Sequence, residues 1–329
     1  MGWENERALV TGAGGFIGSH LVEELVQRGA RVTALVHYNA RSARGNLDFL
    51  PAGMRNQIEV VFGDVRDPFS VNRVVRSQSV VFHLAALIGI PYSYHAPHSY
   101  VETNIHGTLN VLQAAIEHGA RVVQTSTSEV YGSALYVPID EQHPLQPQSP
   151  YSASKIGSDS LAISYHRSFE LPVTIVRPFN AFGPRQSARA IIPTILSQLA
   201  RRAPRLRLGS LTPSRDFTYV ADLARAFVAA AECEAAVGQV TNFGTGRGVT
   251  IGELVEKCCA IADHFPEIEV EESRIRPEAS EVTRLLCNNT RAVDLTGWRP
   301  QVSFDDGLRR VFEFITDHPP LFAGDHYAI

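Results

Sequence analysis

A glycine-rich turn between an expected strand and an expected helix constrains the fold of this chain most strongly. Residues 7–11 (Arg-Ala-Leu-Val-Thr) are typical of a short buried strand, and they run directly into Gly12-Ala13-Gly14-Gly15-Phe16-Ile17-Gly18. A helical pattern follows this turn. Glycines at positions 12, 15 and 18 allow the backbone to approach a pyrophosphate held at the helix N-terminus. The turn therefore predicts a dinucleotide site, with a ligand-free tight turn as the alternative.

Short apolar runs alternate with helical patterns along the first half of the chain. This alternation predicts an α/β fold, a doubly wound parallel (Rossmann) sheet with ligands at the carboxyl ends of its strands. We expect a dinucleotide-binding domain over 1–178 and a smaller, mixed substrate-binding region over 179–329, partly interleaved with the sheet. The expected strands are 7–11, 31–36, 58–63, 79–84, 121–126 and 173–179. The expected helices are 16–28, 69–76, 99–118, 151–169, 191–202, 218–232 and 250–264.

The composition argues against several classes of protein. The 329 residues are 44% hydrophobic and 19% charged, and their net charge of −4 gives no electrostatic reason to expect nucleic acid. No long apolar run and no basic segment before an apolar one occurs, so we expect no membrane span, no secretory signal and a cytoplasmic location. The four cysteines and 12 histidines lack ligand spacing, which predicts buried thiols and no metal.

Lysine is nearly absent from this chain, yet one of its two lysines follows a tyrosine by four residues. Tyr151 and Lys155 would share one face of the expected helix 151–169. An ammonium group close to a phenol lowers the phenol's pKa from about 10 toward neutral pH. The pair therefore predicts that Tyr151 acts as a general base or acid.

Small and polar residues follow the ends of the expected strands. Asp64 comes after the third strand, where it could bond an adenine or simply form a turn. Ala85 and Ala86 follow the fourth strand, and their small side chains would let a cofactor lie against the backbone. The fifth strand ends in Thr125-Ser126-Thr127-Ser128-Glu129-Val130-Tyr131-Gly132, a cluster of hydroxyls with one carboxylate. Such a cluster could exchange protons with a sugar, although Glu129 could also be a surface carboxylate.

Over essentially its whole length, the chain resembles the extended short-chain dehydrogenase/reductases of the nucleotide-sugar epimerase and dehydratase superfamily. The matching residues are Gly12, Gly15 and Gly18, Ser126-Thr127, Tyr151 with Lys155, Arg177-Pro178-Phe179-Asn180, Arg215-Asp216-Phe217 before Asp222, and Leu295-Thr296-Gly297-Trp298-Arg299-Pro300. The order of these motifs is specific to the superfamily.

The resemblance implies a role for individual residues. The catalytic set would be Thr127, Ser128, Glu129, Tyr151 and Lys155. The cofactor-binding set would be Gly12, Gly15, Phe16, Ile17, Gly18, His37, Asn39, Arg41, Asp64, Val65, Leu84, Ala85, Ala86, Ser126, Tyr151, Lys155 and Pro178. The substrate-binding set would be Asn180, Arg185, Arg215 and Arg276, of which the arginines would clamp a diphosphate. Arginines are otherwise more often solvated surface charges, and Asn180 could instead form the turn before Gly183-Pro184.

Glu129 divides the superfamily. Ser126-Thr127-Ser128-Glu129 resembles the active-site set of sugar 4,6-dehydratases, whereas most simple 4-epimerases carry no glutamate there. Ser128 stands where dTDP-glucose dehydratases have an aspartate, while GDP-mannose dehydratases have a similar serine. Segments 137–141, 186–190 and 276–282 are similar to UDP-N-acetylglucosamine-type dehydratases of the legionaminic-acid kind. The resemblance thus implies a lyase that forms a 4-keto-6-deoxy sugar nucleotide by internal hydride transfer.

Several alternatives stay open. UDP-glucuronate decarboxylases carry a very similar Thr-Ser-Glu-Val-Tyr-Gly stretch, and a 4-epimerase is a further possibility. A non-enzymatic dinucleotide-binding protein would typically have lost Tyr151 or Lys155. No acidic residue in 37–40 can bind a ribose 2′-hydroxyl, while Arg41 and Arg44 could hold a 2′-phosphate. NAD and NADP therefore both remain, and the resemblance implies a cofactor retained through turnover and a homodimer formed by helices 99–118 and 151–169.

Overall fold

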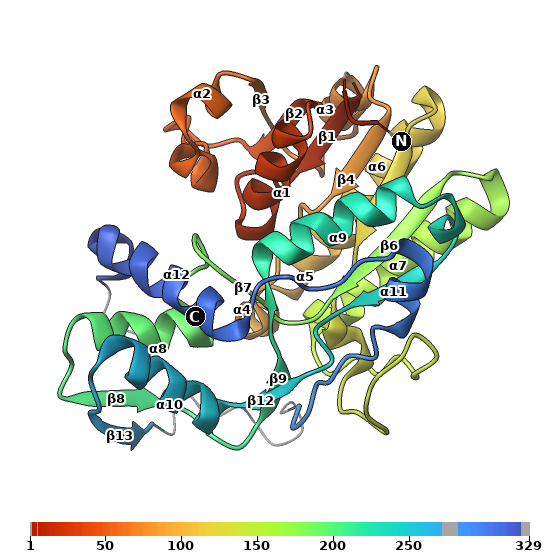
Figure 1. The fold of residues 1–329 in the computed structure, drawn as a ribbon. Coiled ribbons are helices and arrows are strands. Elements are labelled where there is room, and N and C mark those ends of the chain that lie inside the picture. The colour runs from red at the N-terminus through yellow and green to blue at the C-terminus, as the bar shows by residue number, and fades with distance from the viewer. Residues whose placement is uncertain (1, 5, 272–281, 324–329) are drawn as a thin grey trace.

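A seven-stranded parallel sheet forms the centre of the protein (Figure 1). The computed structural model describes residues 2–4, 6–271 and 282–323. The strand order is β11-β6-β5-β4-β1-β2-β3, and the chain changes direction across the sheet between β1 and β4. The strands are β1 (Arg7–Thr11), β2 (Arg31–His37), β3 (Ile58–Gly63), β4 (Val80–His83), β5 (Arg121–Thr125), β6 (Val173–Pro178) and β11 (Val240–Phe243). Ligands bind such sheets at the carboxyl ends of the strands beside this switch point.

Helices cover both faces of the sheet (Figure 1). On one face lie α1 (Phe16–Gln27) and α9 (Val220–Glu232), and on the other lie α3 (Pro68–Val75), α6 (Gly107–His118) and α7 (Pro150–Phe169). Successive side chains of a strand point to opposite faces, so Val10 enters the first core and Leu9 the second. A strand buried on both faces needs an unbroken apolar run, as β1 has. The expected doubly wound α/β fold is confirmed.

The C-terminal part of the chain adds a smaller layer with its own apolar core. Leu196, Leu254 and Leu308 bring its three main helices together. These helices are α8 (Ile191–Ala200), α10 (Ile251–Ala262) and α12 (Phe304–Asp317). Short strands pair as β7 (Ala181–Phe182) with β10 (Thr218–Tyr219), β9 (Ser214–Asp216) with β12 (Gly248–Thr250), and β8 (Arg205–Leu208) with β13 (Glu267–Val270). Since α9 and β11 return to the large sheet, the division at residue 178 stays a prediction.

The expected strands and helices are present with bounds that agree within two residues, except for helix 99–118. That segment is α5 (Pro97–Tyr100), a π-helical stretch (Val101–His106) and then α6. π-Helical turns within α-helices often occur at functional sites. The remaining short helices are α2 (Ala52–Arg55), α4 (Ile90–His95) and α11 (Thr290–Thr296), with 3₁₀ turns at Gly45–Phe49, Ser128–Tyr131, Glu234–Ala236 and Pro319–Phe322.

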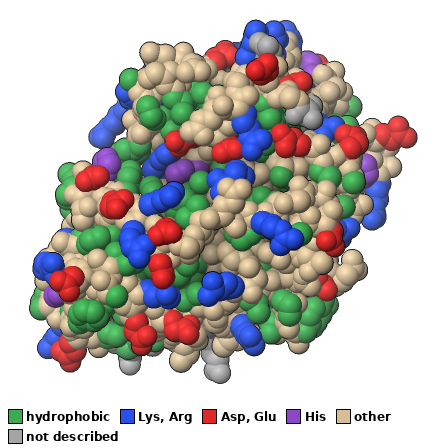
Figure 2. All heavy atoms as spheres, viewed as in Figure 1, with side chains coloured by type: hydrophobic (Ala, Val, Ile, Leu, Met, Phe, Trp, Pro, Cys, Tyr) green, Lys and Arg blue, Asp and Glu red, His purple; other side chains and the backbone are tan. Residues whose placement is uncertain are grey.

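Charges of both signs are interspersed over the face of the molecule that Figure 2 shows. In the described part of the chain, no helix combines the length and the apolar character needed to cross a membrane. Among the same residues, no three His, Cys, Asp or Glu side chains are grouped so as to hold a metal ion. All four cysteines are free. Cys258, Cys259 and Cys287 are buried and Cys233 is partly buried.

His83 links β4 to β1 and α6 through a chain of hydrogen bonds in the core. Thr11 Oγ1 accepts from the backbone N–H groups of Leu84 and Ala85, both at 3.1 Å. Its own proton must then go to His83 Nδ1, 2.8 Å away. The ring therefore carries its proton on Nε2 and donates it to Thr108 Oγ1 at 3.2 Å. His83 is neutral, and it holds the end of β4 against the turn that follows β1.

We expect the stability of the protein to depend on pH through His83. Burial, with the charge of Lys155, lowers the pKa of this ring from 6.5 to about 3. Between these values the unfolded chain binds a proton that the folded one does not, so stability is complete above about pH 6.5 and is lost as pH falls. The contribution of His83 to the slope should approach about 1.4 kcal/mol per pH unit, and His20, whose pKa is also lowered by burial to about 3, adds a similar contribution. Urea unfolding between about pH 7 and pH 4.5 measures it.

The control is His95→Gln, because His95 is exposed and its side chain forms no hydrogen bond or ion pair with a described residue. This variant should keep the slope of the unmodified protein. Nitrogen-15 NMR of the His83 ring gives an independent readout, since only the neutral Nε2–H form has an unprotonated Nδ1. A protonated ring near pH 6 would contradict the hydrogen-bond chain.

Candidate active site

The glycine-rich turn joins β1 to α1 and is closed by a bond from Gly15 N to Gly12 O of 2.9 Å. Gly12 has φ of +69°, and a Cβ there would lie 2.8 Å from Ala85 N. A Cβ on Gly18 would overlap Gly12 O. Helix α1 begins at Phe16, and Gly15 at its N-cap has no side chain to accept from the first-turn amides. These amides, including that of Ile17, are available to an anion, so the turn fits a dinucleotide pyrophosphate.

A cavity of about 370 Å³ opens beside this turn at the carboxyl ends of the strands. Its volume lies within the range usual for small-molecule sites. It is lined by Gly12, Leu35, His37, Gly63, Asp64, Val65, Arg66, Ala85, Ala86, Leu87, Tyr92, Ser99 and Thr103. Six predicted cofactor residues, Gly12, His37, Asp64, Val65, Ala85 and Ala86, are thus brought to one cavity. Sequence reasoning missed Tyr92, Ser99 and Thr103, which come from segments with no strand-end signal.

Asp64 is paired with Arg66, a contact that sequence analysis missed. Arg66 Nε donates to both carboxylate oxygens at 3.0 and 2.9 Å, and its terminal nitrogen donates to Oδ2 at 2.5 Å. These hydrogen bonds hold the pKa of Asp64 below its ordinary value. The Asp-x-Arg spacing could have indicated this pair. Asp64 is therefore an ionised acceptor on the cavity wall.

The loop after β2 holds itself together. Asn39 Oδ1 accepts from Ala43 N at 2.9 Å, and its Nδ2 donates to Ala43 O at 2.9 Å. The side chain of this predicted cofactor residue is thus committed to its own loop. Arg41 and Arg44 are exposed and form no ion pair with any described residue.

Helix α7 carries Tyr151 and Lys155 into the core. A capping box between Ser149 and Ser152 fixes where this helix begins. The Tyr151 hydroxyl is hydrogen-bonded to the side chain of Thr127, whose Oγ1 also accepts from Glu129 N at 3.2 Å. Three predicted catalytic residues, from the end of β5 and from α7, therefore meet at one point. Lys155 Nζ donates to Thr125 O at 2.5 Å in the same region.

The expectation that Lys155 lowers the pKa of Tyr151 is wrong for the protein by itself. Burial raises the pKa of the phenol well above its ordinary value; the bond to Thr127 opposes this, and the charge of Glu129 adds to it. The Lys155 ammonium is held at the Thr125 carbonyl, and burial lowers its pKa to about 8. Spacing on the helix brought the two side chains to one face, but the low dielectric of the site decides the protonation of Tyr151.

Glu129 is the carboxylate of this site. Its side chain is partly exposed, and it forms no ion pair with any residue that the structure describes. It is near enough to Tyr151 for its charge to act on the phenol. The neighbouring Ser128 is buried. Glu129 is thus free to accept a proton from a molecule bound beside Tyr151.

A buried ion pair supports the catalytic helix. Arg177 Nη2 lies 2.9 Å from Asp159 Oδ2, and both side chains are less than 5% exposed. Ser126 Oγ donates to the same oxygen at 2.5 Å. Arg177 also donates to the Tyr131 hydroxyl at 3.0 Å, which donates to Asn242 Oδ1 at 2.7 Å. The hydroxyl of Ser126, a predicted cofactor residue, therefore serves this network.

The predicted substrate residues have different surroundings. Arg185 forms an ion pair with Glu23 of α1 and also contacts Ser19, so its guanidinium is committed to that helix. Asn180, after β6, has a buried Oδ1 with no hydrogen-bond partner. Arg215 lies buried on β9. Arg276 lies outside the described residues. Two residues of the predicted cofactor set lie at strand ends: Pro178 ends β6 beside Phe243, and Leu84 follows β4.

Breaking the Asp159–Arg177 pair should be strongly destabilising. Asp159→Asn leaves a buried guanidinium without its counter-charge, and we expect the free energy of unfolding to fall by about 3–5 kcal/mol. The exposed pair between Arg309 and Asp306 offers the control, since Arg309→Gln should cost about 1 kcal/mol or less. Urea unfolding measures both. A loss below about 1 kcal/mol for Asp159→Asn would show that the pair is not a scaffold.

Comparison with known proteins agrees with this geometry. The family model described as GDP-mannose 4,6 dehydratase matches residues 9–311. The chain belongs to this family. Its relatives are nucleotide-sugar epimerases, dehydratases and decarboxylases of the extended short-chain dehydrogenase/reductase superfamily, so the expected resemblance is confirmed.

Relatives with three different activities are similar to this chain at comparable identity. A dTDP-glucose 4,6-dehydratase of Streptomyces griseus is 36% identical, covering 94% of each chain. A UDP-glucose 4-epimerase of Mycolicibacterium smegmatis is 33% identical, covering 94% of this chain and 98% of the relative. A UDP-N-acetyl-alpha-D-glucosaminuronate decarboxylase of Bacillus cytotoxicus is 30% identical, covering 95% and 98%. As a member of this family, the protein is thus an enzyme that modifies nucleotide sugars.

A solved structure has the same fold and a dinucleotide. The dTDP-glucose 4,6-dehydratase DesIV of Streptomyces venezuelae, with NAD and TYD bound, has a TM-score of 0.84 and 32% identity. The match covers 96% of this chain and 99% of that one.

Proposed function

We propose that the protein is a nucleotide-sugar 4,6-dehydratase that forms a 4-keto-6-deoxy sugar nucleotide, with a UDP-N-acetylglucosamine-like substrate. The observation that carries this proposal is the free Glu129 carboxylate beside Tyr151 and Thr127. A 4-epimerase needs only the oxidation and reduction of carbon 4. A dehydratase also needs a base for the proton on carbon 5, and Glu129 can supply it.

We propose NAD as the cofactor, retained through turnover. The glycine turn and the N-terminus of α1 would hold its pyrophosphate, and the cavity beside Asp64 would take its adenosine. When bound, NAD⁺ supplies a hydride acceptor and a positive charge. The NAD in a dehydratase structure of similar fold supports this choice. NADP is the alternative, because Arg41 and Arg44 could hold its 2′-phosphate.

The residues of the site divide the remaining chemistry among them. Tyr151 would take the proton of the sugar's 4-hydroxyl, and Thr127 would hold that oxygen. The 4-keto group acidifies carbon 5, whose proton Glu129 would remove as water leaves from carbon 6. The resulting double bond would then take back the hydride at carbon 6 and a proton at carbon 5, so that the cofactor ends as it began. Glu129, or Ser128 with a water, would protonate the leaving hydroxyl. A well-placed general acid or base contributes about 10²–10⁴-fold to the rate.

Asn180 and Arg215 are the proposed contacts to the substrate. The Asn180 Oδ1 has no protein partner and can accept from a hydroxyl of the sugar, and Arg215 presents a planar guanidinium suited to the oxygens of the diphosphate. We do not extend this role to Arg185, because Glu23 neutralises it. A homodimer through α5, α6 and α7 and a cytoplasmic location remain predictions.

The first experiment offers four substrates separately without added reductant: UDP-N-acetylglucosamine, GDP-mannose, dTDP-glucose and UDP-glucuronate. We expect UDP-N-acetylglucosamine to lose one water, as seen by mass spectrometry. Loss of water from another hexose would change the substrate but keep the reaction. Loss of carbon dioxide from UDP-glucuronate would replace the proposal with a decarboxylase, which the decarboxylase relative makes the second candidate. An unchanged mass with inverted carbon 4 would replace it with an epimerase.

Replacing Glu129 should separate the steps of the reaction. In Glu129→Gln, oxidation of carbon 4 should continue while the carbon 5 proton stays in place, so dehydration should fall by about 10²–10⁴-fold. Reduced nicotinamide should accumulate, and deuterium from solvent should not enter carbon 5. The control is Glu313→Gln, an exposed residue of α12 that should leave every step unchanged. A normal dehydration rate in Glu129→Gln would remove Glu129 from the mechanism.

A further inference from the structure

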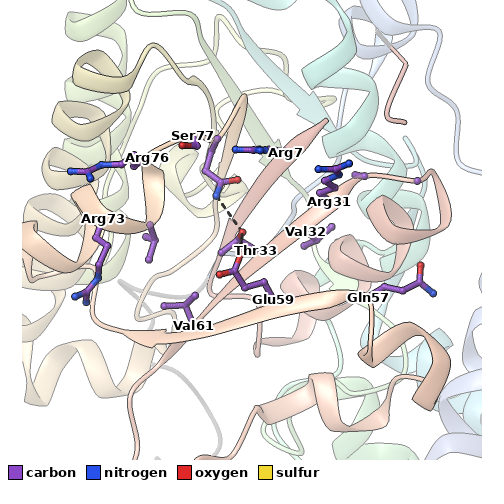
Figure 3. A pocket seen from close by; sticks show the side chains of 14 residues that line it. Arg7, Arg31, Val32, Thr33, Gln57, Glu59, Val61, Arg73, Arg76 and Ser77 are labelled. Carbon is purple, nitrogen blue, oxygen red and sulfur yellow. Dashed lines mark hydrogen bonds between the residues drawn. The ribbon is translucent and has the colours of Figure 1, made fainter. Parts of the chain in front are cut away.

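A second, larger cavity lies at the opposite edge of the sheet from the candidate active site. Its volume is about 710 Å³, and it opens at the amino ends of β1, β2 and β3 beside the end of α3 (Figure 3). It is lined by Arg7, Gly29, Ala30, Arg31, Val32, Thr33, Gln57, Glu59, Val61, Arg73, Val74, Arg76, Ser77 and Gln78. No residue of the predicted catalytic, cofactor or substrate sets is among them.

Arginines dominate this cavity. In Figure 3, Arg73 and Arg76 lie on one side and Arg7 and Arg31 on the other. Arg7 and Arg31 are register partners on adjacent strands, an arrangement in which like charges repel. Arg7, Arg73 and Arg76 form no ion pair with any residue in the described ranges. The chain as a whole has a net charge of −4, so this local positive excess favours an anion.

Between the arginines the cavity offers hydrogen-bond acceptors. Thr33 Oγ1 donates to Glu59 Oε2 at 3.0 Å and accepts from Gln78 Nε2 at 3.2 Å (Figure 3). Gln78 Oε1 is buried and has no hydrogen-bond partner, which leaves an acceptor that needs a donor. The Glu59 carboxylate would repel a bare anion but accept from a hydroxyl. A ligand that carries both an anionic group and hydroxyls matches this arrangement.

The lining also limits what such a ligand can be. Its volume suits a small metabolite. None of the fourteen lining residues is aromatic, so nothing stacks on a nucleobase. Arginine guanidinium groups recognise phosphate by paired, charge-assisted hydrogen bonds.

We propose that this cavity is a binding site for a small phosphorylated polyol of the sugar-phosphate class. Arg73 and Arg76, with Arg7, bind the phosphate, and Glu59 and Gln78 accept hydrogen bonds from hydroxyl groups. The site is separate from the nucleotide-sugar site and does not depend on which reaction occurs there.

Calorimetric titration tests the proposal on the full chain. Saturating NAD and UDP are present so that the candidate active site is filled, and the probes are glucose 6-phosphate, glucose 1-phosphate and inorganic phosphate. We expect at least one sugar phosphate to bind with a stoichiometry of one and more tightly than inorganic phosphate. Arg73→Gln/Arg76→Gln should weaken binding about tenfold or more, the effect of losing charge-assisted hydrogen bonds.

The control is Arg167→Gln/Arg299→Gln, which removes two exposed arginines that do not line the cavity. It should bind the probes as the unmodified protein does. Glu59→Gln tests the hydroxyl contacts. Loss of the Glu59 charge should ease phosphate binding equally for all probes. The ratio of the affinities for sugar phosphate and inorganic phosphate therefore reports the hydrogen bonds to the hydroxyl groups alone. This ratio should fall several-fold, about the effect of one charge-assisted bond.

Three results would overturn the proposal. One is the absence of saturable binding by any probe. A second is equal binding by the Arg73/Arg76 variant and the control. The third is the lack of any preference between sugar phosphate and inorganic phosphate, which would leave an anion site of a different class. Thermal unfolding of each variant, measured alongside, shows whether a loss of binding reflects a loss of fold.

Discussion

The buried ion pair between Asp159 and Arg177 is the interaction on which the geometry of the candidate active site depends. Asp159 lies one turn beyond Lys155 on α7, Arg177 is on β6, and Ser126 follows β5. Burying two charges is costly unless each is well bonded, and here Asp159 Oδ2 receives hydrogen bonds from Ser126 Oγ and from Arg177 Nε and Nη2. Together these hydrogen bonds fix the position of α7 against the sheet. Tyr151 and Lys155 reach the end of β5 because of that position.

The same pair also affects the chemistry at the site. Burial alone lowers the pKa of Lys155, and the negative charge of Asp159 acts in the opposite direction. For Tyr151 burial raises the pKa, and the charges of Glu129 and Asp159 act in the same direction. The protein by itself therefore favours a neutral phenol. Among the groups that act on this phenol, the side chain of Thr127 lowers the pKa through its hydrogen bond, and it carries no charge to stabilise a phenolate.

Much of the fold could be predicted because it is encoded locally. Two-faced burial requires apolar runs such as Leu9-Val10, and turns that need positive φ require glycine at Gly12. The edge strand β11 was missed because Val240-Thr241-Asn242-Phe243 is short and half polar, and pairing with β6 decides its structure. Helix α12 was also missed, although its stripe of Leu308, Val311 and Ile315 has helical spacing.

The sequence predicted which residues belong to the candidate active site, but not which residues their side chains contact. The motifs marked Ser126, Asp64 and Arg185 as ligand contacts. Only the folded chain shows that they are engaged by Asp159, Arg66 and Glu23. The pairs Ser126–Asp159 and Arg185–Glu23 join residues far apart in the sequence, and spacing carries no information about such contacts. Burial of Tyr151 is likewise a property of the assembled site, which is why a pairwise argument from Lys155 gave the wrong direction for its pKa.

The two cavities differ in how the charges of the arginines that line them are balanced. At the carboxyl edge, Arg66 lines the cavity and is paired with Asp64, while Arg41 and Arg44, which form no ion pair with a described residue, do not line it. At the amino edge Arg121 pairs with Glu234, whereas Arg7, Arg73 and Arg76 have no such partner among the described residues. An isolated exposed arginine needs no partner, because water solvates it. Several gathered around one concave surface repel each other, and an anion relieves that repulsion.

The two cavities are lined by opposite ends of the same strands. On β1, Arg7 lines the larger cavity, and Gly12 directly after the strand lines the smaller one. On β2 the corresponding residues are Thr33 and His37. At about 3.3 Å per residue, the five residues of β1 span roughly 17 Å. A ligand at the amino edge would therefore contact strands that lead directly to the dinucleotide turn, and any coupling between the sites would pass through the sheet itself.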